Sequence, residues 1–259
     1  LHRLGSDPRI GAVGGKLLRP QGIVLEAGGI VWRDGSIQPY QRDAAALQGE
    51  VHFRRDVDYC SRAFLLVRTT LLQELDGFDD ALLPGGYEDV DLCVRIQQAG
   101  LRVVYDPAIA VYHAGTPMTP AELSAPVQTF RAKHAEWLQQ RPAADPAAVV
   151  FARHAGPPAQ RVLFIEDMLP LRSLGSGFVR SNDIIRTMVD MGYGLTVFPV
   201  APNRFELAAV YADMPDTVEV MRDRGLDGLR DLLRARTGYY DAIWIARTHN
   251  LDHVLPILQ

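Results

Sequence analysis

Three carboxylates lie within four positions of one short segment, "GGYEDVDLCVRIQQAG" at residues 85–100. They belong to Glu88, Asp89 and Asp91, and two glycines precede them. Acids in the first turn of a helix face the positive end of the helix dipole, and each is stabilised by about 0.3–1 kcal/mol. A carboxylate beside an open glycine turn can also accept a proton from a reacting hydroxyl, as a general base does. The segment alone supports the structural and the catalytic interpretation about equally.

The segment that carries these acids is expected to be a helix from near Glu88 to Gly100. Its apolar residues recur at helical spacing, and glycine commonly ends a helix. Asp91 lies about 200° around this helix from Asp89, so the two side chains should not share one site. We expect Asp91 to be solvated or to pair with Arg95, four residues further on.

The composition is that of an ordinary globular chain. It has 259 residues, 47% of them hydrophobic, and a formal net charge of -4. This suggests one or two domains and gives no support for nucleic-acid binding. No apolar run reaches the ~20 residues that a membrane-spanning helix needs, and the two cysteines imply no disulfide framework. We expect a cytoplasmic protein, and peripheral binding at the inner face of the membrane stays open.

Both ends of the chain resemble cut points. The first residue is Leu1 rather than a methionine, and "HVLPILQ" at residues 253–259 lies within an apolar, periodic segment. We therefore expect a piece of a longer protein.

The first 140 residues alternate predicted strands, turns and helices. We predict a strand running into a glycine turn at 10–18, a hairpin at 23–40 with its turn at Asp34 and Gly35, and a strand followed by a short helix at 57–78. A buried strand at 101–113 follows the acidic helix. We then predict a helix in which His134 is a packing residue, together with Phe130, Trp137 and Leu138.

The rest of the chain divides into a linker and a second pattern. Residues 141–160 are rich in proline and alanine and lack periodicity, which indicates a linker. Beyond it, predicted strands alternate with predicted helices: strands at 161–167, 194–200 and 240–247, and helices at 181–193 and 225–236. This β-α-β-α-β order is typical of the start of a doubly wound parallel sheet.

Three blocks of the first part carry a family resemblance: "IGAVGGKLLRPQGIVLEAGGIVWRDG", "VDYCSRAFLLVR" and "GGYEDVDLCVRIQQAGLRVVYDPAIAVYH". They resemble the family 2 glycosyltransferases, which have the GT-A fold and act in bacterial polysaccharide or O-antigen synthesis. The resemblance covers residues 1 to about 140. The nucleotide-binding first strands of that family and its "DxD" metal motif should precede Leu1, so the resemblance implies the C-terminal half of a GT-A domain.

The resemblance implies roles for individual residues. Asp89 would be the catalytic base, Glu88 would support it or cap the helix, and His113 would be a metal ligand. The acceptor would lie near Asp58, Cys60, Ser61, Arg62 and Gly86. The family usually has a small residue in place of Arg62, which leaves the shape of the acceptor open. Mg²⁺ or Mn²⁺ would be bound mostly by the upstream motif.

Residues 161–259 resemble the start of a second glycosyltransferase domain, of GT-B type (family 4-like). The segments "VLFIEDMLPLRSLGSGFVRSNDIIRTM" and "YYDAIWIARTHN" carry this similarity. Gly175, Ser176 and Gly177 lie beside a predicted helix, where backbone N–H groups can bind a phosphate. Arg180 stands in place of the third glycine of the dinucleotide fingerprint, which argues against an oxidoreductase.

These patterns predict an α/β glycosyltransferase fragment: an incomplete GT-A domain at 1–140, a linker at 141–160 and the N-terminal part of a doubly wound, Rossmann-like GT-B domain at 161–259. Its reaction would be the transfer of a hexose, with inversion, from a nucleotide-sugar donor to a glycan or lipid-linked glycan acceptor. The fragment alone is expected to be inactive, because half of each active site would lie outside it. A non-catalytic module that binds a glycan or a partner enzyme stays open as an alternative.

Overall fold

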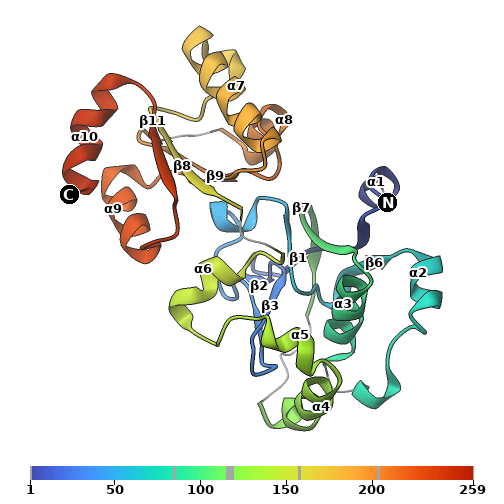
Figure 1. Cartoon of the computed structure of the whole chain (residues 1–259). Helices are drawn as coiled ribbons and strands as arrows, with labels where there is room; N and C mark the ends of the chain where they lie inside the picture. The colour runs from blue at the N-terminus through green and yellow to red at the C-terminus, as the bar shows by residue number, and fades with distance from the viewer. Residues whose placement is uncertain (1, 84–85, 115–119, 157–158, 203–204, 259) are drawn as a thin grey trace. The chain divides into compact units, whose positions relative to one another are not determined.

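The computed structural model describes residues 2–83, 86–114, 120–156, 159–202 and 205–258, with the backbone alone for 120–124. The chain forms two compact units. Unit 1 comprises Leu1–Ala46 and Arg55–Gly156, and unit 2 comprises Leu47–Arg54 and Pro157–Gln259. Figure 1 shows the elements of both units, coloured from blue at the N-terminus to red at the C-terminus.

A five-stranded mixed sheet forms the centre of unit 1. Its middle strand is β1 (Ile10–Leu18), which pairs in parallel with β7 (Arg102–Tyr112) and antiparallel with β2 (Val24–Glu26) and β6 (Leu65–Val67). β5 (Arg55–Asp56) pairs with the other side of β7. A second, two-stranded sheet consists of β3 (Gly29–Val31) and β4 (Ile37–Pro39), which form the predicted hairpin around Gly35.

The predicted glycine turn at the end of the first strand is wrong, because β1 continues through it. All nine residues of β1 are buried. A Cβ on Gly14 would lie 2.2 Å from Cys60 Cβ, and one on Gly15 would lie 2.7 Å from Ile109 Cγ2. The two glycines therefore allow neighbouring segments to approach β1 closely, and they do not turn the chain.

The acidic helix of unit 1 is confirmed as α3 (Glu88–Gln98). It packs closely on the central strand, since a Cβ on Gly11 would lie 2.5 Å from Ile96 Cγ2. The other helices of this unit are α1 (His2–Ser6), α2 (Thr69–Glu74), α4 (Pro120–Lys133), α5 (Ala135–Gln139) and α6 (Val149–Ala152), with 3₁₀ turns at Arg62–Phe64, Asp80–Leu82 and Pro146–Ala148.

Two predicted strands of unit 1 differ from the structure in extent. The strand expected from residue 57 is short, because a 3₁₀ turn occupies 62–64 and only Leu65–Val67 is extended. The strand expected at 101–113 is present as β7, but half-buried residues alternate with exposed ones in its second half. A fully buried strand was therefore predicted correctly only for the first half of β7.

The predicted linker at 141–160 is folded over most of its length. Its residues up to Gly156 belong to unit 1. Arg153 is 2% exposed and donates to Tyr40 Oη at 2.8 Å, and the Ala155 N–H donates to the Asp56 carbonyl at 3.0 Å. The proline and alanine content suggested a linker. The contacts that hold this segment to unit 1 are made instead by the Arg153 side chain and by backbone groups. Residues 157–158 lie outside the described part of the chain.

Unit 2 is built on a four-stranded parallel sheet in the order β10-β9-β8-β11. The strands are β8 (Arg161–Glu166), β9 (Gly194–Pro199), β10 (Glu219–Val220) and β11 (Ala242–Ile245), and the helices are α7 (Ser176–Asp190), α8 (Leu207–Asp213), α9 (Gly225–Ala235) and α10 (Thr248–Leu258). The 3₁₀ turn Arg172–Leu174 precedes α7. Neither β10 nor α8 was predicted from the sequence.

The two faces of this sheet are covered by different helices (Figure 1). Val162 and Phe164 of β8 join a core with residues of α7 and α8, whereas Leu163 and Ile165 join a core with residues of α9 and α10. Across the sheet, the strands lie in the order third, second, first and fourth, counted by their position in the chain. The connections therefore run in one direction from β8 to β10 and in the opposite direction from β8 to β11. The predicted doubly wound arrangement is therefore present, with its switch point between β8 and β11.

A short segment from the first half of the chain packs in unit 2, contrary to the predicted 1–140 domain. The Arg54 N–H donates to the Asp216 carbonyl at 2.6 Å, and Arg224 pairs with Glu50 at 2.5 Å. Gly49 lies so close to β10 that a Cβ would be 2.1 Å from the Val220 oxygen. The sequence contains no periodic signal for these contacts, which depend on the tertiary fold.

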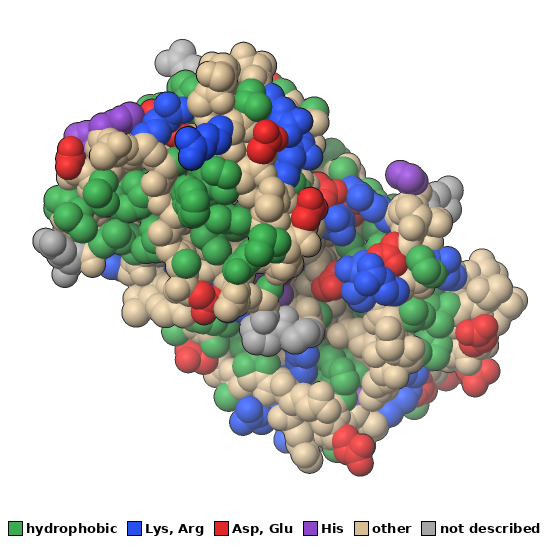
Figure 2. Space-filling model, turned by 45° about the horizontal axis from the view of Figure 1, so that its top comes forward, with side chains coloured by type: hydrophobic (Ala, Val, Ile, Leu, Met, Phe, Trp, Pro, Cys, Tyr) green, Lys and Arg blue, Asp and Glu red, His purple; other side chains and the backbone are tan. Residues whose placement is uncertain are grey.

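Several large hydrophobic side chains of unit 2 are exposed, and Figure 2 shows hydrophobic side chains gathered on the face of this unit turned to the viewer. Met191 is 67% exposed and Trp244 is 42% exposed. Both line an open groove of about 560 Å³ along α7. Within the described residues, no helix combines the length and the apolar character that crossing a bilayer requires.

The close packing at Gly14 gives a stability prediction. Gly14→Ala should lower the free energy of unfolding by about 1–3 kcal/mol, because the new methyl group overlaps Cys60 in a close-packed core. Urea denaturation of both proteins measures this difference. Gly5→Ala is the control, since a Cβ there meets nothing within 4 Å. Equal stability of Gly14→Ala and the wild type would contradict the packing.

Candidate active site

Asp89 lies in the first turn of α3, where two backbone N–H groups hold its carboxylate. The Arg62 N–H donates to Oδ2 at 2.9 Å, and the Val90 N–H donates to Oδ1 at 2.8 Å. The residue is 7% exposed. Both oxygens therefore have a fixed orientation in a site that is nearly closed to bulk water.

Burial changes the acid–base behaviour of this carboxylate. Loss of hydration raises the pKa of Asp89 to about 6, and the neighbouring charge of Glu88 acts in the same direction. The N–H bonds from Arg62 and Val90 lower the pKa but do not cancel the effect of burial. A carboxylate with a pKa near 6 is ionised at neutral pH and still has an appreciable affinity for a proton, which suits a general base.

Arg62 contacts both neighbouring acids. Its backbone holds Asp89, and its guanidinium contacts the carboxylate of Glu88. The Glu88 side chain is 0% exposed, whereas the Arg62 side chain is 51% exposed. The predicted role of Glu88 as a support for Asp89 therefore has a structural partner, since the ion pair holds the loop at Arg62 against α3.

A third carboxylate, that of Glu26, lies beside those of Glu88 and Asp89. The sequence analysis did not predict Glu26 as a site residue. The Ser61 N–H donates to Glu26 Oε1 at 2.8 Å, and the residue is 6% exposed. Burial raises the pKa of Glu26 to about 8, and the charge of Asp89 contributes to the increase. The one signal in the sequence was a single acid within the apolar strand "IVLEAGG".

The remaining residues predicted near the acceptor have different surroundings. Asp58 accepts the Val31 N–H at 2.9 Å and an Arg141 N–H at 2.6 Å, and Cys60 is 1% exposed against Gly14. Both side chains are therefore occupied by internal contacts. Ser61 and Arg62 contact the acidic group. Gly86 has a φ of 71°, a conformation that favours glycine, and Gly85 lies outside the described residues.

Asp91 points to a different part of unit 1 from Asp89, as predicted. Its carboxylate contacts Arg95 at 2.7 Å, Lys133 at 2.8 Å and His134 Nε2 at 2.7 Å. Its pairing with Arg95 is confirmed, but its side chain is 0% exposed, so the solvated alternative is wrong. His134 is also more than a packing residue. Burial alone would raise the pKa of Asp91, but hydrogen bonds from His134, Lys133 and Arg95 lower it to about 2.

His113 follows β7 and is exposed. Its backbone N–H donates to the Leu18 carbonyl at 2.8 Å. Among the residues that the structure describes, no group of three or more His, Cys, Asp or Glu side chains could hold a metal ion. The described residues therefore do not fit a complete metal site, and His113 as a ligand stays a prediction.

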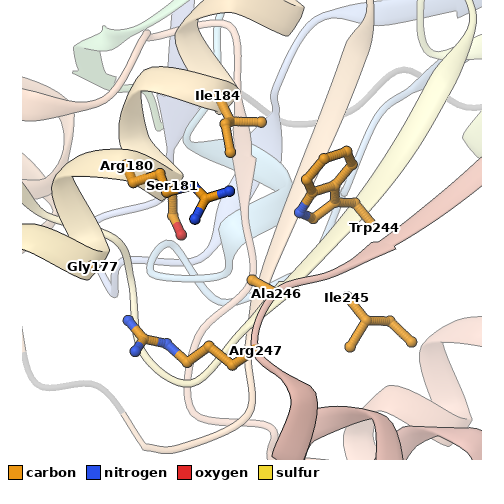
Figure 3. A pocket seen from close by; sticks show the side chains of 8 residues that line it. All are labelled: Gly177, Arg180, Ser181, Ile184, Trp244, Ile245, Ala246 and Arg247. Atoms are coloured by element: carbon orange, nitrogen blue, oxygen red, sulfur yellow. The ribbon is translucent and has the colours of Figure 1, made fainter.

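A second candidate site lies in unit 2, at the switch point between β8 and β11. A pocket of about 300 Å³ is lined by Gly177, Arg180 and Ser181 of α7 and by Trp244 and Arg247 on or after β11. Figure 3 shows the Arg180 and Trp244 side chains pointing toward each other, with the Arg247 guanidinium beside Gly177. Ligands of open α/β sheets commonly bind in this crevice.

Arg247 is held in an unusual conformation at this pocket. Its φ is 68°, and its Nε donates to Glu166 Oε1 at 2.6 Å. Glu166 is fully buried and also accepts the Ser181 hydroxyl at 2.5 Å. Of the three residues predicted to bind a phosphate, Gly177 lines this pocket, Ser176 lines the neighbouring apolar groove, and Gly175 has a φ of 123° at the start of α7.

Comparison with known proteins finds a family model that matches much of unit 1. Residues 36–133 match the model described as "Glycosyltransferase like family 2". This segment is similar to family 2 glycosyltransferases, and we call it the family 2-like domain. The match includes Ser61, Arg62, Glu88 and Asp89, and so it covers most of the acidic site. It stops at residue 133 and does not test the GT-B start predicted at 161–259.

Relatives of the family 2-like domain have names from glycan synthesis. The chain is 41% identical to the rhamnosyltransferase WbbL of Escherichia coli over 61 residues, 22% of this chain and 21% of that protein. It is 32% identical to the O-antigen biosynthesis protein RfbC of Myxococcus xanthus over 111 residues, 41% of this chain and 9% of that protein.

A third relative is the pre-mycofactocin glycosyltransferase of Mycobacterium tuberculosis. It is 39% identical over 57 residues, 22% of this chain and 12% of that protein. The similarity therefore spans only about a tenth to a fifth of the length of these curated relatives.

The Asp91 contacts give a prediction on stability and its pH dependence. Asp91→Asn should lower the free energy of unfolding at pH 7 by about 3 kcal/mol, because it leaves the partly buried cations Arg95 and Lys133 without their counter-charge. The lowered pKa means that Asp91 contributes stability above about pH 4, and this contribution is lost as the pH falls toward 2. The difference between variant and wild type should therefore shrink in acid.

Chemical denaturation at several pH values tests this prediction. Asp80→Asn serves as the control, since Asp80 is exposed in the same unit. A difference between Asp91→Asn and the wild type that stays constant from pH 7 to pH 3 would contradict the assigned ion pairs.

Proposed function

We propose that this chain carries the acceptor side and the general base of a glycosyltransferase. The enzyme would move a sugar from a nucleotide-sugar donor to a glycan or lipid-linked glycan. The names of the relatives favour bacterial surface polysaccharide or O-antigen synthesis as the context. The single observation that carries the proposal is Asp89, a buried carboxylate with raised proton affinity, held by two N–H groups within the family 2-like domain.

The proposed reaction is a displacement with inversion. The acceptor hydroxyl oxygen attacks the anomeric carbon, its proton passes to the Asp89 carboxylate, and the nucleoside diphosphate leaves with the electrons of the broken bond. General-base catalysis of this kind typically contributes about 10²–10⁴ in rate. A divalent cation such as Mg²⁺ or Mn²⁺ would supply charge neutralisation of the leaving diphosphate. The described residues do not form a complete site for this cation.

The alternative is a non-catalytic module that holds a glycan or a partner enzyme. The pKa of Asp89 favours the enzyme, because a binding module gains nothing from a buried carboxylate with raised proton affinity. We place the enzyme in the cytoplasm, with peripheral binding to the membrane as a further possibility to test.

For unit 2 we propose the start of a GT-B-type domain. Its support is the doubly wound strand order and the pocket at the switch point. We further propose that Gly175, Ser176 and Gly177 bind a phosphate group, with the guanidinium of Arg180 beside them. Backbone N–H groups at a helix start favour anions, and an arginine adds a charge-assisted bond.

Asp89→Asn is the central test of the proposed base. In the full-length protein it should lower kcat by about 10²-fold or more and leave the KM for the donor nearly unchanged, because it removes the proton acceptor alone. Release of nucleoside diphosphate from a panel of nucleotide sugars is the measurement. Asp190→Asn, an exposed substitution in α7, is the control.

Turnover assays distinguish the proposed glycosyltransferase from the non-catalytic binding module. We expect residues 1–259 alone to turn over no nucleotide sugar, because the described residues provide the proposed base but no complete site for the cation that would neutralise the leaving diphosphate. An Asp89→Asn enzyme with wild-type kcat would remove Asp89 as the base. Complete absence of turnover in the full-length protein with every donor would favour the binding module.

Binding of pyrophosphate tests the site proposed in unit 2. Titration with inorganic pyrophosphate should shift the backbone amide resonances of Ser176 and Gly177, and Arg180→Ala should weaken the apparent affinity about 10-fold, since one charge-assisted bond is lost. Arg230→Ala removes the same charge from the exposed side of α9 and should have little effect. Equal weakening by both variants would show that only the general charge of the unit matters.

A further inference from the structure

Three buried carboxylates meet at two consecutive residues of unit 1. The Ser61 N–H holds Glu26, the Arg62 N–H holds Asp89, and the Arg62 guanidinium contacts Glu88. Each of these acids is at most 7% exposed. They come from β2 and α3, which lie more than 60 positions apart in the sequence, so the fold has gathered them.

The charges around Glu26 do not balance if all three acids are ionised. The loop provides one cation, Arg62, which contacts Glu88. Arg42 is exposed and acts on Glu26 only at longer range. The other titratable groups that face it are Tyr59, Cys60 and Cys93, and burial raises the pKa of each, so they remain neutral. Like charges gathered in a low-dielectric site cannot all be retained.

The described residues hold no group of three or more potential ligands placed for a metal, so these acids do not form a metal site by themselves. A proton on one of the acids removes the imbalance. Glu88 has its arginine, and Asp89 accepts two N–H bonds, which favour its charged form. Glu26 accepts one N–H bond, so it is the acid that keeps the proton.

We propose that Glu26 is an acceptor-binding residue that works as a neutral carboxylic acid beside the base. Its Oε1 accepts the Ser61 N–H, and among the described residues no hydrogen bond to its second oxygen is found. As an O–H group, that oxygen donates a hydrogen bond to an oxygen of the acceptor sugar, next to the hydroxyl that Asp89 deprotonates. This inference rests on the proposed function for its substrate, but the protonation of Glu26 can be tested without activity.

The neutral acid has a consequence above pH 8. When Glu26 loses its proton, the donor becomes an acceptor and a second negative charge appears beside Asp89. Binding of the acceptor should then weaken, while binding of the nucleotide sugar is unaffected. The proposed enzyme would show an increase in the KM for the acceptor on the alkaline side, with its midpoint near 8.

NMR titration of the ¹³C-labelled carboxyl groups in the 259-residue chain is the first experiment. One glutamate resonance, absent from Glu26→Gln, should titrate near pH 8 instead of near the ordinary 4.5. The stability of the wild type relative to Glu26→Gln should fall as the pH rises from about 4.5 to 8 and become constant above it, because the folded state binds this proton more tightly than the unfolded state. A Glu26 midpoint near 4.5 would overturn the inference, whatever the enzyme does.

Kinetics in the full-length protein is the second experiment. Glu26→Gln keeps a neutral donor and should raise the KM for the acceptor by no more than about threefold, whereas Glu26→Leu removes the donor and should raise it by about 10-fold or more. Glu74→Gln, at the exposed end of α2, is the control. A larger loss in Glu26→Gln than in Glu26→Leu would overturn the neutral-donor role. If the NMR midpoint is near 8 but no sugar is transferred, the proposed function fails and the protonation of Glu26 stands.

Discussion

The hydrogen bond from the Arg62 N–H to the Asp89 carboxylate is the contact on which the site of unit 1 depends. It joins the loop before β6 to the first turn of α3, and both elements pack on β1. The approach is possible because β1 carries glycines where its neighbours come closest, Gly11 against α3 and Gly14 against Cys60. A larger side chain at either position would separate the loop from the helix. The geometry of the acids is therefore a consequence of packing at the central strand.

Two acids of the same helix have opposite effects on stability. Asp91 is buried with three cationic or potentially cationic partners, so its ionised form is favoured and it stabilises the fold above about pH 4. Asp89 is buried with only N–H donors and an acidic neighbour, and its pKa is raised to about 6. Its ionisation therefore costs stability as the pH rises from about 4 to 6. Buried carboxylates whose ionisation costs free energy are more common in catalytic sites than at structural positions.

Arginines from distant segments neutralise buried acids in both units. Arg141 reaches Asp58 from beyond α5, Arg62 meets Glu88, and Arg247 meets Glu166 at the switch point of the parallel sheet. Because each of these acids is buried, removal of its arginine leaves a buried charge without a partner, and each pair fixes the position of a loop. At Arg247 the pair accompanies a positive φ, which an arginine rarely adopts without compensation. The ion pair between Arg247 and the buried Glu166 thus also places Arg247 at the pocket beside α7.

The sequence by itself determined many of the local elements and the resemblance to a family. Periodicity located α3, β7 and the alternating elements of unit 2, and residue motifs pointed to the family that residues 36–133 match. It also separated Asp89 from Asp91, because the helical repeat alone puts them on different sides. Tertiary structure alone decided that Glu26 joins the acidic site, that the predicted linker packs on unit 1, and that residues 47–54 belong to unit 2. Each of these depends on a contact between residues far apart in the chain, made by a backbone group or an arginine, and such contacts leave no periodic pattern in the sequence.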